Sequence, residues 1–263
     1  MNLLAFDTGT DVMSIAVSRT RAGQTQYWQH TSAGGPQTST GLIPAIVGLM
    51  QQAELPLSAL DAICFGSGPG SFTGLRTACA VAQGLAFGAN VPVLAVDSLM
   101  AVAEEARHTA LAAQPHGVVT ALLDARMDEL YVGTYAFDGP QWTVVQPSGL
   151  VRPEDLQAPD LAAPHDSAVW VMAGNVFAVY GDRVAAGDAR AAAAVRIPAL
   201  PTAQALLRLA PALLAAGQAV SAEHAMPRYV RDKVAKTTAE RAAEKAAIAA
   251  IASPTGASDE ARP

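Results

Sequence analysis

The sequence predicts an α/β fold made of two related lobes, each with a mixed β-sheet flanked by helices. Two observations lead to this prediction. Early in the chain, hairpin-forming strands are followed by strands that alternate with helices, an order typical of a mixed sheet covered by helices. A strand that ends in Asp, a turn and a return strand then occur a second time, so that residues 120–134 align with residues 3–17. This repeat indicates a duplicated lobe.

The first lobe is predicted over residues 1–113. Its opening segment, LLAFD, is an apolar run of strand length, and Gly9 supplies the tight turn into a return strand. Turn-forming residues between the later apolar runs mark the remaining boundaries. Strands are expected at 2–7, 12–18, 24–30, 62–66 and 91–96, and helices at 39–53, 72–88 and 98–113.

The second lobe is predicted over residues 114–236 and has fewer clear helices. Its one convincing helix, over 202–217, can pack back onto the first lobe. It should begin at Thr202 as N-cap, stop at Gly217, and be kinked or split at Pro211. Strands are expected at 118–124, 129–137, 142–146 and 168–173.

Residues 237–263 form a separate tail in this prediction. The tail is rich in Ala, Glu, Lys and Arg and ends in Ser, Pro, Gly and Asp. Residues 238–252 suit only a marginal helix, and the last ten residues are expected to be disordered.

The first hairpin turn is a candidate phosphate site. It consists of Asp7, Thr8, Gly9 and Thr10, and an Asp at a strand end followed by Gly and hydroxyl groups can hold a metal-bound water and a phosphate. An ordinary turn closed by an Asp side chain is an equally good interpretation. The matching turn, Asp124-Ala125-Arg126, has no Gly, so the second half of such a nucleotide site looks degraded. Arg126 can reach an anion there or form a buried ion pair with Asp124 or Asp128.

The segment from Gly66 to Arg76, GSGPGSFTGLR, joins a strand to a helix. It contains neither a Walker lysine nor an intact dinucleotide-binding fingerprint. A structural role therefore explains it well, with Ser71 capping the helix and Gly74 allowing a close approach to a neighbour. Phosphate binding at the helix N-terminus stays open as the alternative.

Composition excludes several other classes of protein. The five histidines form no metal-binding spacing, so neither a metal site nor a metallopeptidase is expected. The formal charge of −6 makes the chain a poor nucleic-acid binder without a basic partner. Cys64 and Cys79 suit core thiols in a reducing cytoplasm. The sequence lacks a signal peptide and an apolar run long enough for a transmembrane helix, so no membrane association is expected.

The helices over 39–53 and 72–88 are apolar nearly all round. A helix that covers only a sheet needs one apolar stripe, so these two should bury a second face. The stripe from Ala78 to Ala86, with Ala80 and Gly84, would permit very close packing. The second face is expected to meet another chain, although the helix over 98–113 is an internal alternative.

Four segments, in the order of the chain, together resemble the TsaB family, also called YeaZ. The resemblance runs from Met1 to about Lys236, and the tail beyond Thr237 extends past the family's usual end. GPGSFTGLR, a downstream DARM and a late P-x-Y-[LV]-R are highly specific as a set. The segments are LLAFDTGT, GSGPGSFTGLR with AQGLAFG, LLDARMDELYVGTY and EHAMPRYVRDKVA.

This resemblance implies an actin-like, hexokinase-like ATPase fold. It also implies a non-catalytic subunit of the complex that forms N6-threonylcarbamoyladenosine in tRNA. Such a subunit binds and activates TsaD through the two helices, forms a homodimer when alone, and works with the ATPase TsaE, while tRNA contacts only the complex. Expected interface residues are Leu42, Ile43, Ile46, Val47, Met50, Thr73, Arg76, Thr77, Ala80, Val81 and Gly84.

No intrinsic cofactor is expected, and weak ATP or ADP binding at the remnant turns stays open. The competing hypothesis is an autonomous ATPase or kinase that uses Asp7. The family often has a His before the first helix, in HTQ, where this chain has Thr38-Ser39-Thr40, so no role of that His transfers. The basic run Arg228, Arg231, Lys233 and Lys236 is a further candidate contact for tRNA or a partner.

Overall fold

A computed structural model describes residues 1–161 and 168–231 of the chain. Met1–Val230 form one compact unit, and the remainder from Arg231 is a second unit. The helix expected over 238–252, the C-terminal end for which disorder was expected, and Lys233 and Lys236 all lie outside the described residues.

The first sheet has five strands in the order β3-β2-β1-β4-β5. The central strand β1 pairs antiparallel with β2 and parallel with β4. Strand β4 is buried along its whole length and β2 over Met13–Ser18, because helices cover the two faces of this sheet. The strands are β1 Leu3–Asp7, β2 Val12–Arg21, β3 Gln24–Ala33, β4 Ala62–Gly68 and β5 Val93–Asp97.

The second sheet repeats this topology. Its order is β10-β9-β6-β7-β8, with β6 antiparallel to β7 and parallel to β9, so β6 takes the place of β1. The two mixed five-stranded sheets confirm the predicted α/β class and the duplicated arrangement. The strands are β6 His116–Arg126, β7 Glu129–Asp138, β8 Gln141–Val151, β9 Trp170–Gly174 and β10 Val195–Pro198.

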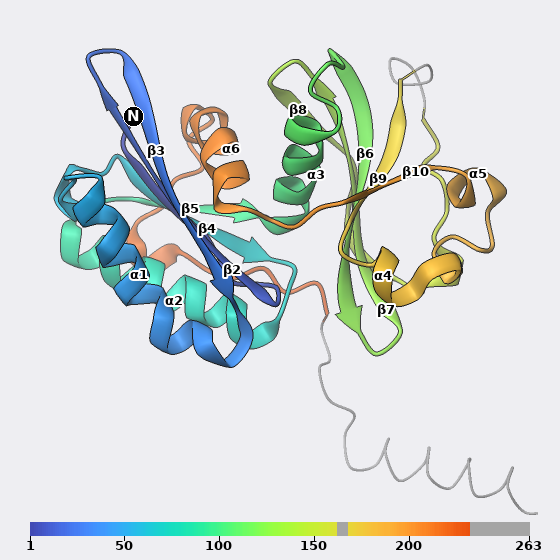
Figure 1. The fold of residues 1–263 in the computed structure, drawn as a ribbon, viewed down its shortest axis with the longest axis horizontal. Coiled ribbons are helices and arrows are strands. Elements are labelled where there is room, and N and C mark those ends of the chain that lie inside the picture. The colour runs from blue at the N-terminus through green and yellow to red at the C-terminus, as the bar shows by residue number, and fades with distance from the viewer. Residues whose placement is uncertain (162–167, 232–263) are drawn as a thin grey trace, which may run out of the picture. The chain divides into compact units, whose positions relative to one another are not determined.

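Helices cover both faces of the first sheet (Figure 1). Helices α1 (Thr38–Gln52) and α2 (Phe72–Ala89) lie together on one face, and α6 (Ala203–Ala215) covers the other face. Helix α3 (Ser98–Thr109) packs on β6, β7 and β9 of the second sheet and against α6. Since α3 packs there, it leaves the outer faces of α1 and α2 uncovered.

Two local expectations about helix ends and breaks need correction. Helix α6 is not split at Pro211 but continues through it, because burial of its inner face, including Leu206 and Leu209, outweighs the loss of one backbone hydrogen bond. Thr202 caps this helix as expected, accepting from the Ala205 amide at 3.1 Å. Ser71 precedes α2 but makes no side-chain cap, and α2 starts instead from backbone contacts of the Gly-rich loop.

The sequence interpretation missed three short elements of the second lobe. They are α4 (Phe177–Tyr180), α5 (Ala189–Ala192) and the edge strand β10. Each spans only four residues, which is too short for a helical or alternating pattern to stand out.

The turn between β2 and β3 allows a direct test of local geometry. Ala22 and Gly23 form a two-residue hairpin with φ values of 50° and 78°. Such a turn favours Asn at its first position, because Asn tolerates the left-handed conformation better than Ala. Ala22→Asn is expected to raise the free energy of unfolding by about 0.5 kcal/mol, measured by urea denaturation. The β-branched variant Ala22→Val should lower it, and equal effects of the two variants would contradict the assigned turn.

Candidate functional site

Asp7 lies at the end of β1 and is almost fully buried, with 1% of its surface exposed. One carboxylate oxygen accepts from the Gly9 amide at 2.7 Å, and the other accepts from the Ser98 hydroxyl at 2.8 Å. Burial raises the pKa of this carboxyl from 3.8 to about 6, although both hydrogen bonds lower it. Both oxygens of the candidate metal anchor are therefore already bonded within the protein.

The Gly-rich loop packs directly on the first hairpin turn. A Cβ at Gly74 would overlap the Thr8 carbonyl, and one at Gly70 would lie 2.7 Å from the Gly9 carbonyl oxygen. The Thr8 hydroxyl donates to the Gly74 carbonyl at 2.8 Å, and the Ser71 amide donates to the Gly9 carbonyl at 2.7 Å. The glycines thus allow the chain itself to cover the turn, as expected for Gly74.

Thr10 completes this turn without an outward-facing hydroxyl. Its side chain both donates to the Val12 carbonyl and lies 3.2 Å from the Val12 amide. This arrangement is an ordinary turn closed by its own side chains, which was one of the two interpretations of the sequence. In this conformation the four residues from Asp7 to Thr10 bond to their own chain.

The second turn carries Arg126 in place of a Gly. Its guanidinium pairs with Asp124 at 3.1 Å and with Asp11 of the first hairpin at 3.0 Å, so it links the two hairpin turns. The expected buried pair is wrong in its environment, because 69% of the Arg126 side chain is exposed. Asp128 instead pairs with Arg183 at 3.1 Å. The exposed ion pairs of Arg126 contribute little to stability. They do, however, engage the guanidinium that was a candidate for binding an anion.

Asp124 is also held within its own lobe. Its carboxylate accepts from the Tyr180 hydroxyl and from the Arg126 amide, each at 2.8 Å. Burial, with the hydrogen bond and charge of Asp124, raises the pKa of Tyr180 to about 12. Residues Arg126 to Asp128 all have positive φ, near 60°, which is a turn without the glycines that a phosphate approach needs. Across the described ranges, no three His, Cys, Asp or Glu side chains converge as a metal site requires.

The outer faces of α1 and α2 are the second candidate site. Ile43 and Val47 on α1 expose 48% and 44% of their surface, and Phe87 on α2 exposes 80%. Small residues Ala80 and Gly84 are exposed on the same helix as Phe87. Of the other expected interface residues, Thr73 and Arg76 are exposed, and Thr77 and Val81 are half-buried.

Three of the expected interface residues belong to the core of their own lobe. Leu42, Ile46 and Met50 are exposed by 0%, 1% and 6%, and they pack between α1 and the first sheet. They lie on the inner side of α1, so they support the outer face without presenting side chains on it. A charge at Ile46 would be buried in this core, so Ile46 is unsuitable for testing the surface.

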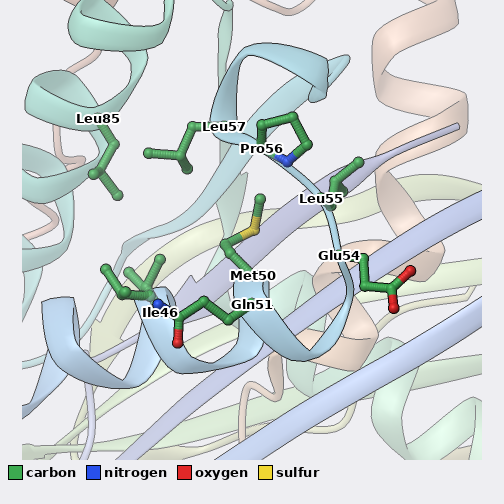
Figure 2. Close-up of a pocket in the computed structure, with 9 residues that line it drawn as sticks. Ile46, Met50, Gln51, Glu54, Leu55, Pro56, Leu57 and Leu85 are labelled. Carbon is green, nitrogen blue, oxygen red and sulfur yellow. The ribbon is translucent and has the colours of Figure 1, made fainter.

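An apolar groove of about 360 Å³ opens at the C-terminal end of α1. Figure 2 shows side chains of α1, of the following loop and Leu85 of α2 around the same space. Its lining is Ile46, Val47, Met50, Gln51, Glu54, Leu55, Pro56, Leu57 and Leu85. Val47 belongs to both the groove and the exposed face, so the groove continues that face.

The sequence interpretation missed four exposed residues beside this face. Phe87 is the most exposed large apolar side chain of the described residues, and its spacing of three and seven from Gly84 and Ala80 could have revealed it. Phe72, Met226 and Tyr229 expose 39%, 67% and 44% of their surface. The last two come from a segment distant in sequence, which only the fold brings to α2.

The duplicated sheet topology and the paired Asp turns define an actin-like ATPase fold, in which the first turn is covered by the chain's own Gly-rich loop. Comparisons with known proteins narrow this class. The family model of TsaD, described as tRNA N6-adenosine threonylcarbamoyltransferase, matches residues 29–239.

Relatives and solved structures agree on one branch of that family. The TsaB biosynthesis protein of Escherichia coli K12 is 29% identical over 240 residues, covering 89% of this chain and 96% of its own. TsaB of Haemophilus influenzae is 37% identical over 135 residues, covering 50% and 52% of the two chains. The structure of YeaZ from Pseudomonas aeruginosa is 36% identical, with a TM-score of 0.71 over 87% of this chain and 99% of that one. The chain belongs to the TsaD family of this model and, within it, to the TsaB (YeaZ) family.

No helix among the described residues combines the length and the apolar character that crossing a bilayer requires.

Proposed function

We propose that this chain is a non-catalytic subunit in the biosynthesis of threonylcarbamoyladenosine in tRNA, and that it binds and activates TsaD. The relatives named TsaB are described as tRNA threonylcarbamoyladenosine biosynthesis proteins, and TsaD as the threonylcarbamoyltransferase. The observation that carries the proposal is the exposed apolar face of α1 and α2. Such a face costs free energy in water and is typical of an interaction site.

The composition of this face suits a pair of partner helices. Ala80 and Gly84 leave a shallow track on α2, along which another helix can approach closely. Ile43, Val47 and Phe87 flank the track with exposed apolar surface. Helices that meet through small residues and bury larger ones beside them form a compact bundle. When the chain is alone, a second copy would cover the same face and form a homodimer.

Catalytic silence in this proposal rests on the covered first turn. Asp7 is buried with both oxygens bonded, and Arg126 is paired with Asp11 and Asp124, so neither of these two residues is free to bind a nucleotide phosphate. The transferase chemistry then belongs to TsaD, and the ATPase TsaE joins the complex. The acidic chain would meet tRNA only through that complex, in the cytoplasm. ATP turnover by the pure chain that is lost in Asp7→Ala would favour the competing ATPase hypothesis.

The interface is tested by placing one charged side chain on the face. Ala80→Arg is expected to abolish both homodimerisation and co-purification with the TsaD of the same cell, because a long cation cannot fit between closely packed helices. Light scattering measures the mass of the wild-type chain alone and with TsaD. The wild-type homodimer should be replaced by a one-to-one complex.

A matched control is Ala212→Arg, which places the same side chain on an exposed position of α6. This variant should pair with TsaD like the wild type. If Ala80→Arg still co-elutes with TsaD, the face has been chosen wrongly, and if the wild type does not associate at all, the proposed function is lost.

A further inference from the structure

Three side chains form an ordered cluster at the N-terminal end of α2. The Arg76 guanidinium carbon lies 3.6 Å from the centre of the Phe72 ring, so the cation stacks on the aromatic face. The Arg76 Nε donates to the Tyr229 hydroxyl at 3.0 Å. The Phe72 and Tyr229 rings lie 5.5 Å apart with a tilt of 38°. Arg76 is therefore fixed on two sides although it lies at the surface.

Tyr229 is held in place by the segment 221–230, which crosses α2. Ala222 and Ala225 of this segment are buried in the core under α1 and α2. The Ala225 carbonyl accepts from the Gln83 side chain at 3.0 Å. The Arg228 amide donates to the Ser67 carbonyl at 2.7 Å, and its guanidinium pairs with Asp97 at 3.0 Å. These contacts hold the segment against the first lobe as far as Arg228, the residue that precedes Tyr229.

The outward side of Arg76 is open. Its Nε is used by Tyr229, whereas its two terminal nitrogens make no hydrogen bond or ion pair with the described residues. A guanidinium with its terminal nitrogens free presents the planar fork that binds a carboxylate through two parallel hydrogen bonds. Stacking on Phe72 and the bond to Tyr229 reduce the side-chain freedom that binding would otherwise remove.

We propose that the Phe72–Arg76–Tyr229 cluster is the polar anchor of the TsaD interface, and that the Arg76 fork receives an Asp or Glu side chain of TsaD. This inference rests on the proposed function and extends the interface from the two helices to the segment 221–230. Arg76 is one turn of α2 from Ala80, so the cluster continues the exposed face. Tyr, Arg and Met are the residue types enriched at interface anchors, and Met226 adds apolar surface beside the cluster.

A protein carboxylate suits the surroundings better than a nucleic-acid phosphate. The cluster adjoins an apolar stripe on α2, and phosphate backbones are held by several clustered cations and not by apolar surface. Arg228, the cation next to Tyr229 in the sequence, is already paired with Asp97. The chain also carries a formal charge of −6, which opposes a polyanion.

The test measures the affinity of the full chain for TsaD by titration calorimetry at low and moderate salt. Arg76→Gln should weaken binding at least about tenfold and reduce its salt dependence. Arg76→Lys should recover only part of the loss, because an ammonium group cannot form the bidentate pair. Tyr229→Phe keeps the charge of Arg76 but removes the hydroxyl that holds the Arg76 Nε. The guanidinium then gains conformational freedom, and binding should weaken by roughly threefold to tenfold. Arg21→Gln, at an exposed Arg away from α2, is the control and should bind normally.

The carboxylate is then located by charge exchange. Arg76→Glu should fail to bind wild-type TsaD, and a single Asp→Arg or Glu→Arg change on the TsaD surface should restore binding. The inference is overturned if Arg76→Gln and Tyr229→Phe bind TsaD like the wild type while Ala80→Arg does not, and the proposed function then stands. It is also overturned if Arg76→Gln leaves TsaD affinity intact but weakens tRNA binding by the complex, since that result assigns the fork to phosphate. If the wild type itself does not bind TsaD, both proposals fail.

Discussion

Glu104→Gln is expected to lower the free energy of unfolding by about 3 kcal/mol, because it disrupts a buried charge network between helices. Only 2% of the Glu104 side chain is exposed. Its carboxylate accepts from Arg107 at 2.8 and 2.9 Å, from Arg208 at 2.8 Å, and from the Trp142 ring nitrogen at 3.0 Å. These donors belong to α3, α6 and β8, so one carboxylate links two helices to a strand of the second sheet. A neutral amide would leave Arg107 without its counter-charge and would leave Arg208 paired with Glu105 alone.

The pH dependence of stability should change in the same variant. Burial alone would raise the pKa of Glu104, but the hydrogen bonds and charges of Arg107, with Trp142 and Arg208, outweigh it and hold the pKa below its usual value of 4.5. A lowered folded pKa contributes stability that is present above pH 4.5 and is lost as the pH falls through the folded value. The wild type should therefore lose this contribution in acid, and Glu104→Gln should show a shallower loss.

Urea denaturation between pH 3 and pH 8 measures both effects. Glu105→Gln is a matched control, because Glu105 binds the same Arg208 at 2.7 Å but is 21% exposed. Its effect should be about 1 kcal/mol. Equal losses for the two variants would show that Glu104 is not the centre of this network.

The sequence predicted the fold because two independent patterns agreed. The alternation of apolar runs and turns marked most of the strands, and the repeated strand that ends in Asp7 and in Asp124 related the two lobes. Sheet order follows from these facts once each strand pairs with its hairpin neighbour and the crossovers stay right-handed. The short elements α4, α5 and β10 lacked such a pattern. Tyr180 of α4 and Ala191 of α5 pack in one core cluster with Met172 and Val176, and β10 pairs with β9, so tertiary contacts define these elements.

The network around Glu104 could not be predicted in the same way. Glu104 and Arg107 are three residues apart on one helix, which usually indicates an exposed pair. Arg208 lies on α6, about a hundred residues further on, and Trp142 lies on strand β8 of the second sheet. No local pattern links these positions, so their convergence is a product of the tertiary fold alone.

The sequence indicated which two helices carry the candidate interface, but not which of their residues lie on the exposed side. An all-round apolar helix shows that two faces are buried or need covering, yet it does not say which face the sheet takes. The structure assigns Leu42, Ile46 and Met50 to the sheet side and leaves Ile43 and Val47 outside. Tyr229 was unpredictable as a neighbour of Arg76, because 153 residues separate them.

Asp7→Asn is expected to stabilise the protein at pH 8 by about 2 kcal/mol, the second-largest effect anticipated here. The pKa of Asp7 is raised from 3.8 to about 6, chiefly because burial disfavours the charged carboxylate. The folded state therefore holds a proton that the unfolded state releases between these two values. A raised acid pKa means that stability falls as the pH rises from about 4 to about 6, and the full cost remains above pH 6.

An amide at this position keeps most of the local hydrogen bonds. Its oxygen can accept from the Gly9 amide, and its nitrogen can donate to the Ser98 hydroxyl, whose oxygen lies 2.8 Å from the carboxylate in the wild type. Asn carries no charge at any pH, so the variant should lack the decline in stability between pH 4 and pH 6. Below about pH 3.8 the two proteins should differ little.

Urea denaturation at half-unit pH steps measures the two curves, and Asp182→Asn, at an exposed carboxylate, should follow the wild type. A variant less stable than the wild type at pH 8 would show that the Gly9 and Ser98 hydrogen bonds outweigh the cost of burying the charge. A stabilised variant that also binds TsaD normally would show that this carboxylate lowers stability without serving the interface. Asp7 would then be a buried remnant of the actin-like turn, which the Gly-rich loop has covered.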